Sequence, residues 1–485
     1  MSDNTVAKES QGVSRRDFLK LSAVAGGTAA LFGSGIGAKE AQAKTYDTID
    51  DMIQIDPAEF KRFKQSDVAF MRRMVPAGLF KEDPADNPEL MAKIFKQDTE
   101  VSFSLGDPGF SQIDQAFEHG GKATYVMMGS SVTGSGMAPE SSVNFETPDG
   151  KLVPWSMFAQ TSDSYPNAGA GFFDVAETKY EFDSPKQAAY AIKKAAKVYG
   201  ADLVGIAPYD ERWVYESQVC IPKDMKGEKI MDKVDLNQKV DFGFEPKSVI
   251  VFAVEMDYET IKTAGSTIEG GATNTGYSFM AEVAMRLAMF IRKLGYHTYH
   301  CGNNVSLSVT EAIRAGLGEA GRLGLLITEE YGPRVRLAKV YTDLEFEYDK
   351  PKSFGVVEFC EVCQVCSDTC PTQALTHLSI NDPENKAVSY NNQAGVKKYY
   401  FDAQKCLLSW YNMGFGSKTN TAYSDCGICV NVCPYNKPQE WHHDLIKVVT
   451  RVPGLNSVAR YFDEFFGYGG IADAQTLTDF WRKEI

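Results

Sequence analysis

Two features that would point to particular partners are missing from this 485-residue sequence. Beyond the N-terminus it has no run of basic residues, and its net charge is −14. Because nucleic-acid binding needs a concentrated basic face, this composition argues against a nucleic-acid partner and indicates a soluble, self-repelling surface. Beyond the N-terminus, no segment has eighteen uninterrupted apolar residues, so we expect the mature protein to be soluble or peripheral to a membrane.

The N-terminus has the pattern of an export signal. Ser14–Lys20 reads Ser-Arg-Arg-Asp-Phe-Leu-Lys, a twin-arginine signature, and Ala41–Ala43 is a small-x-small cleavage site. The weakly apolar stretch between them is interrupted by five glycines, which makes it a poor membrane anchor. We therefore expect residues 1–43 to be a twin-arginine signal peptide. Because this pathway moves folded proteins, commonly after cofactor uptake, it also predicts a cofactor.

Eight of the ten cysteines fall between positions 360 and 433. The first group, which starts at Cys360, has the spacing Cys-x2-Cys-x2-Cys-x3-Cys-Pro of bacterial 4Fe–4S proteins. The second group ends in Cys-x2-Cys-x3-Cys-Pro, and its first cysteine, Cys406, stands twenty positions upstream of Cys426. Zinc prefers paired Cys-x2-Cys knuckles, and a disulfide framework would not need this spacing. The cysteine pattern therefore favours iron–sulfur clusters over a zinc site or disulfides.

In ferredoxins with two clusters, the fourth cysteine of one run ligates the other cluster. This rule predicts two mixed ligand sets. Cys220 and Cys301 are left over, and we interpret each as a buried free thiol. One cluster is assigned to Cys360, Cys363, Cys366 and Cys433, and the other to Cys370, Cys406, Cys426 and Cys429.

The middle of the chain alternates between helical and extended patterns. A helix over 186–199 ends at Gly200, and a strand over 201–207 follows. Residues 248–254 form a continuous apolar run, typical of a strand buried on both faces. A helix from about Thr275 to Leu294 carries one apolar stripe. Further strands are expected over 296–300 and 323–328, with a short helix near 308–315, and the whole indicates an α/β or α+β domain.

The order of these elements and motifs resembles the respiratory reductive dehalogenases, corrinoid and iron–sulfur enzymes that remove halogen from organohalides. The resemblance is weakest over 44–182. The displaced first cysteine of the second cluster motif is a departure that the family shares. Besides the signal and the cysteines, the matching stretches are Ala201–Gly205, Trp213–Tyr215, Gly316–Gly318, Glu330–Leu337 and Asp349–Pro351.

The resemblance implies an α+β fold with a nitroreductase-like corrinoid-binding core and a ferredoxin-like domain that holds two 4Fe–4S clusters. The corrinoid would be bound base-off, and no Asp-x-His-x-x-Gly corrinoid motif occurs. The implied division is a signal peptide (1–43), an N-terminal unit contributing to the substrate pocket (44–182), the corrinoid-binding core (183–350), the two-cluster domain (351–440) and a C-terminal extension (441–485).

The resemblance also implies a catalytic group. Tyr277, at the opening of the long helix, matches the proton-donor tyrosine; Asn303 matches the asparagine of a corrinoid-facing loop; Arg336 matches the arginine beside the tyrosine. Asn304 and Arg334 are the rivals for the last two roles. Corrinoid contacts are expected from Asn303–Ser308, with Tyr277, Ser306 and Ser308, and from 321–336, and Trp410 matches an aromatic wall of the substrate slot.

The implied reaction converts R–X, two electrons and a proton to R–H and halide. A phenol with a pKa near ~10 is a weak acid at neutral pH, and a fixed arginine nearby should lower its pKa. The guanidinium and the asparagine amide would stabilise the negative charge that develops.

Two other functions remain open at this point. One is an epoxyqueuosine-reductase-like corrinoid enzyme, against which the export signal and the acidic surface count. The other is an electron carrier with clusters and no substrate, which would not need the long α/β region before Cys360. By analogy with the family, we expect anaerobic organohalide respiration at the outer face of the cytoplasmic membrane, a membrane-anchor subunit, a low-potential electron donor and a homodimer. The aromatic residues of the N-terminal unit suit haloalkenes and haloaromatics equally.

Overall fold

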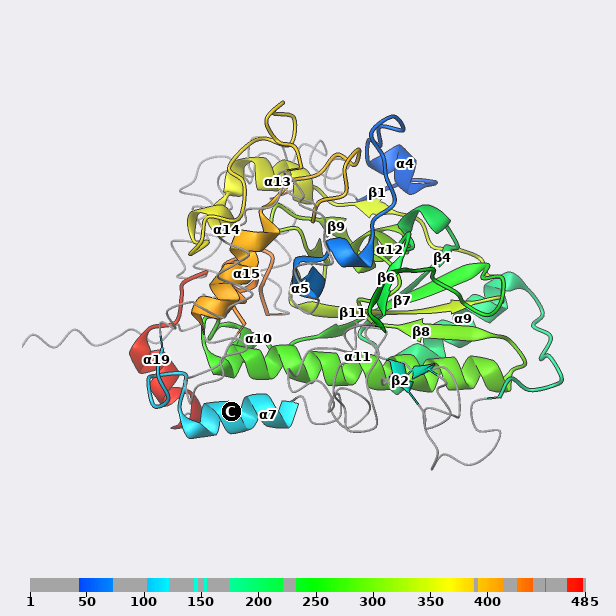
Figure 1. The fold of residues 1–485 in the computed structure, drawn as a ribbon, viewed down its shortest axis with the longest axis horizontal. Coiled ribbons are helices and arrows are strands. Elements are labelled where there is room, and N and C mark those ends of the chain that lie inside the picture. Colours follow the sequence, from blue (N-terminus) through cyan, green and yellow to red (C-terminus); the bar gives the residue numbers. More distant parts are fainter. Residues whose placement is uncertain are drawn as a thin grey trace, which may run out of the picture.

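The computed structural model describes residues 43–72, 103–121, 144–146, 152–154, 174–220, 233–387, 391–413, 425–438, 450 and 469–482. The twin-arginine pattern, most of the expected N-terminal unit with its aromatic residues, and most of 441–485 lie outside the described residues. Figure 1 shows the arrangement of the described elements.

The centre of the fold is a four-stranded sheet in the order β4-β7-β11-β8. All three neighbouring pairs are antiparallel, which is an arrangement of the α+β class. The apolar run of β7 is buried along almost its whole length, as expected for a strand covered on both faces. The nitroreductase-like topology stays a prediction. The strands are β4 (Leu203–Pro208), β7 (Ser248–Glu255), β11 (Val335–Thr342) and β8 (Thr298–Cys301).

Helices cover both faces of this sheet (Figure 1). On one face lie α9 (Pro185–Tyr199) and α11 (Thr267–Lys293), and on the other lies the short α12 (Ser308–Arg314). The Ser184 hydroxyl caps α9 by accepting from the Gln187 amide at 3.1 Å, and Gly200 ends it at a φ of 112°. The sheet therefore has a buried layer on each side.

The long helix α11 begins at Thr267, eight residues before the predicted start, so the prediction that Tyr277 opens it was wrong. The glycines of this first part lower helix propensity, but tertiary packing offsets that cost. A Cβ on Gly271 would lie 2.3 Å from the Phe117 ring, and one on Gly276 would lie 2.8 Å from the Arg336 side chain. Tyr277 consequently sits in the helix interior. The predicted apolar stripe is buried at Met280, Val283, Ala284, Leu287 and Ile291.

Successive side chains of β11 point to opposite faces of the sheet. Ala338 and Val340 belong to the core beneath α9 and α11, whereas Leu337 and Tyr341 belong to the core beneath α12. Because side chains alternate along a strand, Arg336 faces α11 and Lys339 faces α12. One strand thus supplies a cation to each side of the sheet.

Shorter elements surround this core. Of the strand expected over 323–328, only Leu326 and Ile327 are extended, and they pair with Glu319–Ala320. Helix α7 (Gln112–Gly121) packs along α11. The other strands are β1 (Lys44–Thr45) with β12 (Lys352–Ser353), β2 (Asn144–Glu146) with β3 (Leu152–Pro154), β5 (Gln218–Cys220) with β6 (Asp235–Gln238), and β9 (Glu319–Ala320) with β10 (Leu326–Ile327). The other helices are α4 (Ile49–Met52), η1 (Gln65–Asp67), α5 (Ala69–Arg72), η5 (Glu211–Trp213), α10 (Tyr258–Ile261), α13 (Val356–Cys363), α14 (Val365–Asp368), α15 (Ala403–Asn412), α16 (Ile428–Asn431), α19 (Ala474–Asp479) and η7 (Phe480–Arg482).

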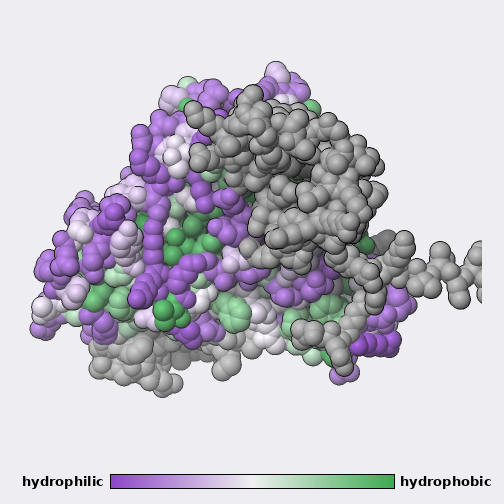
Figure 2. All heavy atoms as spheres, turned by 180° about the vertical axis from the view of Figure 1, so that it is seen from behind, coloured by the Kyte–Doolittle hydropathy of each residue, from purple (hydrophilic) through white to green (hydrophobic). Residues whose placement is uncertain are grey.

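The described surface is largely polar. On the face shown in Figure 2, hydrophilic residues predominate, with a group of hydrophobic residues near the middle. Within the described part of the chain, no helix has the length and apolar character needed to cross a membrane.

Candidate functional site: two cysteine groups and a polar network around one cavity

Seven of the eight clustered cysteines lie in or against one hydrophobic core that includes α13, α14 and α16, and the eighth, Cys406, lies on α15. Cys360 and Cys363 lie on α13 and Cys366 on α14, and with Cys433 they line one small cavity. Burial raises the pKa of the Cys433 thiol well above its usual value, and the nearby Cys360, Cys363 and Cys366 raise it further. The fourth cysteine of the second run therefore lies with the first three cysteines of the first run.

The other four cysteines form the second group. Burial raises the pKa of Cys429 well above its usual value, and Cys426, Cys406 and Cys370 add to this effect. Burial likewise raises the pKa of Cys406 to about 12 and that of Cys426 to about 11. Since iron binds thiolates, cluster insertion must release these protons.

The described residues include no three Cys, His, Asp or Glu side chains that could hold one metal ion together. A cubane keeps its thiolates farther apart than a single ion does, because each thiolate binds a different iron. Four buried thiols around one small cavity suit a cluster in which each thiolate binds a different iron.

Arg322 links the first cysteine group to the rest of the structure. Its backbone N–H donates to Cys360 Sγ at 3.5 Å, and its guanidinium donates to the Cys360, Thr376 and Leu378 carbonyls. The buried guanidinium also lies 4.2 Å from the centroid of the Tyr399 ring. Hydrogen bonds and positive charge beside cluster sulfurs raise the reduction potential, so Arg322 favours electron uptake at this group.

On the sheet side, the three predicted catalytic residues are in contact. Tyr277 is buried, and its hydroxyl oxygen accepts from Asn303 Nδ2 at 3.2 Å and from Arg336 Nη1 at 3.4 Å. The Arg336 guanidinium also lies 4.6 Å from the centroid of the Tyr277 ring and donates to Thr273 Oγ1 at 2.9 Å. Three segments remote in sequence thus meet at one phenol oxygen.

The two rival residues have other contacts. The Asn304 Oδ1 atom accepts from the Gly302 amide at 3.0 Å, which is a local turn contact. Arg334 is buried and forms an ion pair with Glu255 at 2.6 Å. Its guanidinium also lies 5.5 Å from the ring centroids of Tyr258 and Tyr331.

A buried lysine orients the Asn303 amide. Lys339 Nζ donates to Ser308 Oγ at 2.6 Å and also to the Gly302 carbonyl. Since the Ser308 oxygen receives that bond, its own O–H donates to Asn303 Oδ1 at 3.3 Å. The side-chain oxygen of Asn303 therefore accepts a hydrogen bond from Ser308, and this contact directs the side-chain NH2 group of Asn303 to Tyr277.

The loop that carries Asn303 is held against the Trp213–Tyr215 segment. The Tyr215 amide donates to the Val305 carbonyl at 2.8 Å, and the Tyr215 hydroxyl donates to the Asn303 carbonyl at 3.0 Å. Val305 has a φ of 77°, which is unfavourable for a β-branched residue and is tolerated only where surrounding contacts impose it. Backbone strain therefore accompanies the placement of Asn303.

On the far side of Arg336, the network reaches the second cysteine group. Thr273 Oγ1 donates to Glu269 Oε1 at 3.0 Å, and Glu269 lies against Asp425, next to Cys426. Burial raises the pKa of Glu269 well above its usual range, and Asp425 raises it further. A buried, protonatable carboxyl pair thus lies between the second cysteine group and the tyrosine network.

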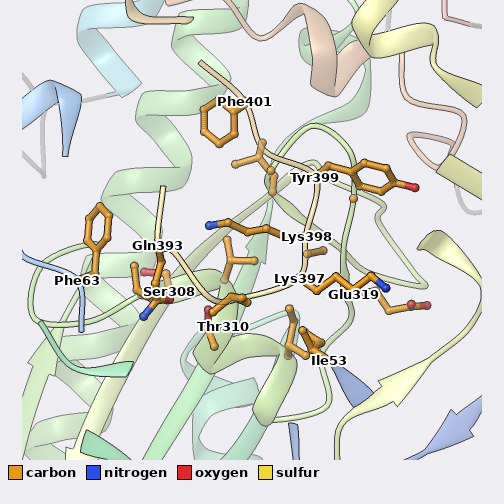
Figure 3. Close-up of a pocket in the computed structure, with 18 of the residues that line it drawn as sticks. Ile53, Phe63, Ser308, Thr310, Glu319, Gln393, Lys397, Lys398, Tyr399 and Phe401 are labelled. Atoms are coloured by element: carbon orange, nitrogen blue, oxygen red, sulfur yellow. The ribbon is translucent and has the colours of Figure 1, made fainter. Parts of the chain in front are cut away.

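A large cavity of about 690 Å³ lies between the sheet and the cysteine region (Figure 3). Asn303 and Ser308 line it at the sheet end. Gly321 and Gly324 line it where the chain turns towards Cys360, and Val357 and Glu358 of α13 also line it. The cavity therefore borders both the Asn303 loop and the helix that carries Cys360 and Cys363. Additional walls come from α4, α5, Lys397–Phe401 and the start of α12.

Three predicted contact residues lie outside the set that lines this cavity. Tyr277 lies one layer behind Asn303. Ser306 is fully buried, and its hydroxyl accepts from the Tyr341 hydroxyl at 2.7 Å in the core. The sequence expectation for Ser306 is based on the Gly and Ser content of these stretches, which would let the backbone approach a flat macrocycle, and its role in binding a corrinoid stays a prediction. Trp410 packs in the cluster of Phe70 and Met71, and Met71 itself lines the cavity.

Several residues of the site carried no role in the sequence. Tyr215 lay in a matching stretch, but its bond to the Asn303 loop depends on a contact 88 residues away. In the sequence, Lys339 is an ordinary charged residue of a strand, and its burial follows from the register of β11. Arg322 lies in the 321–336 stretch that was expected to contact a corrinoid, whereas Thr273 and Lys398 had no local pattern. Cys301 is fully buried with a pKa raised by burial to about 12, in agreement with the interpretation as a buried thiol.

Comparison with known proteins agrees with the sequence patterns. The family described as the 4Fe-4S dicluster domain matches residues 359–437. The twin-arginine translocation pathway signal sequence matches residues 12–32. The chain therefore carries an export signal and a domain for two 4Fe–4S clusters.

Two of the most similar curated proteins are tetrachloroethene reductive dehalogenases. The protein from Dehalobacter restrictus is 43% identical over 318 residues, which cover 60% of this chain and 56% of that protein. The protein from Sulfurospirillum multivorans is 35% identical over 311 residues, covering 61% and 59% of the two chains. The chain thus spans little more than half the length of these relatives.

A solved structure shares the fold. It is a catabolic reductive dehalogenase in complex with 3-bromo-4-hydroxybenzoic acid, with a TM-score of 0.57 and 19% identity, and the match covers 89% of this chain and 49% of that one. In these sequence matches, the shared fold and the dicluster domain, the chain is similar to the reductive dehalogenases over about 60% of its length.

Proposed function

We propose that this chain is a corrinoid-dependent reductive dehalogenase that replaces halogen by hydrogen: R–X plus two electrons and a proton gives R–H and halide. The observation that carries the proposal is the Tyr277 hydroxyl, held by Asn303 and Arg336 beside a cavity whose other wall is the Cys360 helix. Asn303, which contacts the proton donor, and the helix that carries Cys360 thus border one space. The curated relatives carry this activity in their names.

The cavity suits a corrinoid. The periphery of a corrinoid carries many neutral amides, which need neutral donors and acceptors. The cavity supplies such groups from Gln54, Gln65, Asn303 and Gln393, together with backbone at Gly321 and Gly324. No histidine is among its described lining residues, in keeping with a base-off cofactor. We propose that Asn303, Ser308 and the 320–325 turn hold the corrinoid.

The cysteine geometry supports an order for the electron path. Cys360 and Cys363 lie on the helix that lines the cavity, so the cluster of their group would be the nearer donor. The group of Cys370, Cys406, Cys426 and Cys429 would pass electrons to it. Helices α14 and α16, which carry Cys366 and Cys429, pack against each other. A bound corrinoid supplies the reducing centre at which the carbon–halogen bond breaks.

The residues around Tyr277 define the proton step. The Tyr277 oxygen accepts hydrogen bonds from Asn303 and Arg336, and its O–H is the proton that would go to the carbon that loses halogen. Once that proton has left, the phenolate faces two donors that are already in place, Arg336 and Asn303. Because they are half-buried and pre-oriented, these donors stabilise the new negative charge more than water would.

The relatives suggest the substrate class. Both are named for tetrachloroethene, and this cavity has apolar walls from Phe63, Val68, Met71 and Leu307. We propose small chloroethenes as the substrates. The export signal supports a location at the outer face of the cytoplasmic membrane, where a membrane-anchor subunit and a low-potential donor would serve the enzyme. A homodimer and the five-part domain division stay predictions.

Halide release tests the activity. The cluster-loaded chain, reconstituted anaerobically with a corrinoid and a low-potential donor, should release chloride from tetrachloroethene or trichloroethene. Halophenols and an electron-transfer-only assay serve as comparisons. If the protein binds corrinoid but releases no halide from any of them, epoxyqueuosine-type chemistry replaces the proposal. If it binds clusters and no corrinoid, an electron carrier remains.

Iron content tests the ligand sets. Cys433→Ser should lose the cluster of the Cys360 group although Cys433 belongs to the other sequence run, and bound iron should fall by about half. Cys301→Ser is the matched control, because Cys301 is equally buried but lies in β8, away from both groups. Full iron content in Cys433→Ser would contradict the mixed assignment.

A further inference from the structure

Lys398 differs from the other polar residues that line the cavity, because its side chain has no partner among the described residues. It lies in the segment between the two cysteine runs, half-buried, with its ammonium in the cavity. No described residue accepts a hydrogen bond from its Nζ or forms an ion pair with it; its nearest aromatic contact is the Tyr400 ring, 5.4 Å away. Figure 3 shows this side chain extending into the cavity, away from Lys397.

The backbone around Lys398 is anchored on several sides. The Lys397 amide donates to the Gln54 carbonyl at 3.0 Å, and Asn385 Nδ2 donates to the Lys398 carbonyl at 2.9 Å. The Tyr399 hydroxyl donates to Glu361 at 2.6 Å. The direction of the Lys398 side chain is therefore set by the fold, and an ordered ammonium in a desolvated space needs an anion.

The carboxylates that line the same cavity do not fill this need. Glu319 accepts from the Phe354 and Val356 amides and from Ser353, so its oxygens are already used. Glu358 is exposed and forms no ion pair with Lys398. Burial lowers the pKa of Lys398 to about 8, which reflects the missing counter-charge.

We infer that Lys398 binds the phosphodiester of the nucleotide tail of a corrinoid, and so selects complete corrinoids over forms without that tail. The inference rests on the proposed corrinoid dependence. A corrinoid side chain that ends in an amide is neutral, whereas the phosphodiester that links the tail to the ring carries a negative charge. A lysine is suited to such a group as a point charge. Lys397, one residue earlier, reaches Gln54 instead, with its Nζ 3.5 Å from Oε1.

Equilibrium binding of two corrinoids tests this pairing. The full chain, loaded with clusters and free of corrinoid, is mixed with cobalamin or with cobinamide, which has no nucleotide tail, and the retained corrinoid is measured by its visible absorbance. Wild type should bind cobalamin more tightly than cobinamide. Lys398→Met should weaken cobalamin binding by about tenfold or more and leave cobinamide binding unchanged. Lys398→Arg should restore the preference, and Lys397→Met, the matched control, should retain it.

Any other binding result contradicts either the pairing of Lys398 with the phosphodiester or the proposed corrinoid dependence. If Lys398→Met weakens both corrinoids equally, or neither, the pairing with the phosphodiester is wrong while the corrinoid proposal stands. If added inorganic phosphate weakens cobinamide binding as much as cobalamin binding, the lysine is a general anion site and the pairing is again wrong. If wild type binds neither corrinoid, the proposed function fails and the pairing fails with it. Unchanged iron content in every variant shows that the fold is intact.

Discussion

Two regions around the cavity differ in how their lysines are paired. At the sheet end, Lys339 donates to three oxygens, and the hydrogen bonds continue through Ser308 and Asn303 to Tyr277. On another part of the cavity wall, Lys398 reaches into the cavity without a partner among the described residues. The first arrangement is complete without a ligand, as a reaction centre that must not reorganise should be. The second becomes complete only when an anion binds, as a recognition site should.

The largest expected effect separates chemistry from binding. Tyr277→Phe removes the proton donor and keeps the ring, so halide release should fall by about a hundredfold to ten-thousandfold. Corrinoid affinity should not change, because the hydroxyl lies behind the cavity wall. Lys398→Met should show the reverse, with weaker affinity and a normal rate at saturating corrinoid. Halide release and corrinoid retention are measured on both variants, and a shared loss in both would abolish the distinction between the two regions.

The next effect distinguishes two neighbouring asparagines. Asn303→Ala removes one donor to the phenolate, so halide release should fall about tenfold to a hundredfold, the value of a charge-assisted hydrogen bond. Asn304→Ala removes only the bond from the Gly302 amide, and thermal unfolding should show a loss of about 1 kcal/mol with little change in rate. Equal rates in the two variants would remove Asn303 from the reaction.

The third prediction concerns the orientation that Lys339 imposes. Lys339→Met keeps the volume but leaves the Gly302 carbonyl and Ser308 without their donor, at a cost of about 1–3 kcal/mol in the free energy of unfolding. The Asn303 amide can then turn, so the rate should fall by about tenfold. Denaturant unfolding and halide release are the measurements. A stability loss without any change in rate would mean that Lys339 only supports the fold.

The smallest effect is a pH dependence confined to the Lys398 region. The anion favours the protonated lysine, so cobalamin affinity should be complete below the pKa of about 8 in the free chain and should fall as the pH rises above it. Of the other titratable groups here, Tyr399 and Tyr400 have pKa values raised by burial, and so does Glu319. Lys397 and Glu358 complete the set. Cobinamide affinity over the same pH range is the control, and a parallel fall would assign the effect to one of these groups.

Much of the fold could be predicted from sequence where the pattern was local. Ser184, Pro185 and Gly200 define the ends of α9, and the apolar run of β7 signals a strand buried on both faces. The start of α11 was missed because its glycines lower the local propensity, while Phe117 and Arg336 supply the packing that offsets the loss. Of the strand expected over 323–328, the first half is a turn and bend in which Gly324 has a φ of 78°, and only Leu326 and Ile327 form a strand.

The sequence by itself determined the cysteine chemistry and the export signal, because both depend on spacing within a short stretch. It also indicated Tyr277, Asn303 and Arg336 through family likeness. Only the tertiary structure decided which side chains share a hydrogen bond or a cavity. The register of β11 turns Arg336 towards Tyr277 and Lys339 towards Ser308, and the fold aims Lys398 into a space without a counter-charge. Such pairings join residues far apart in the chain, so no local pattern can encode them.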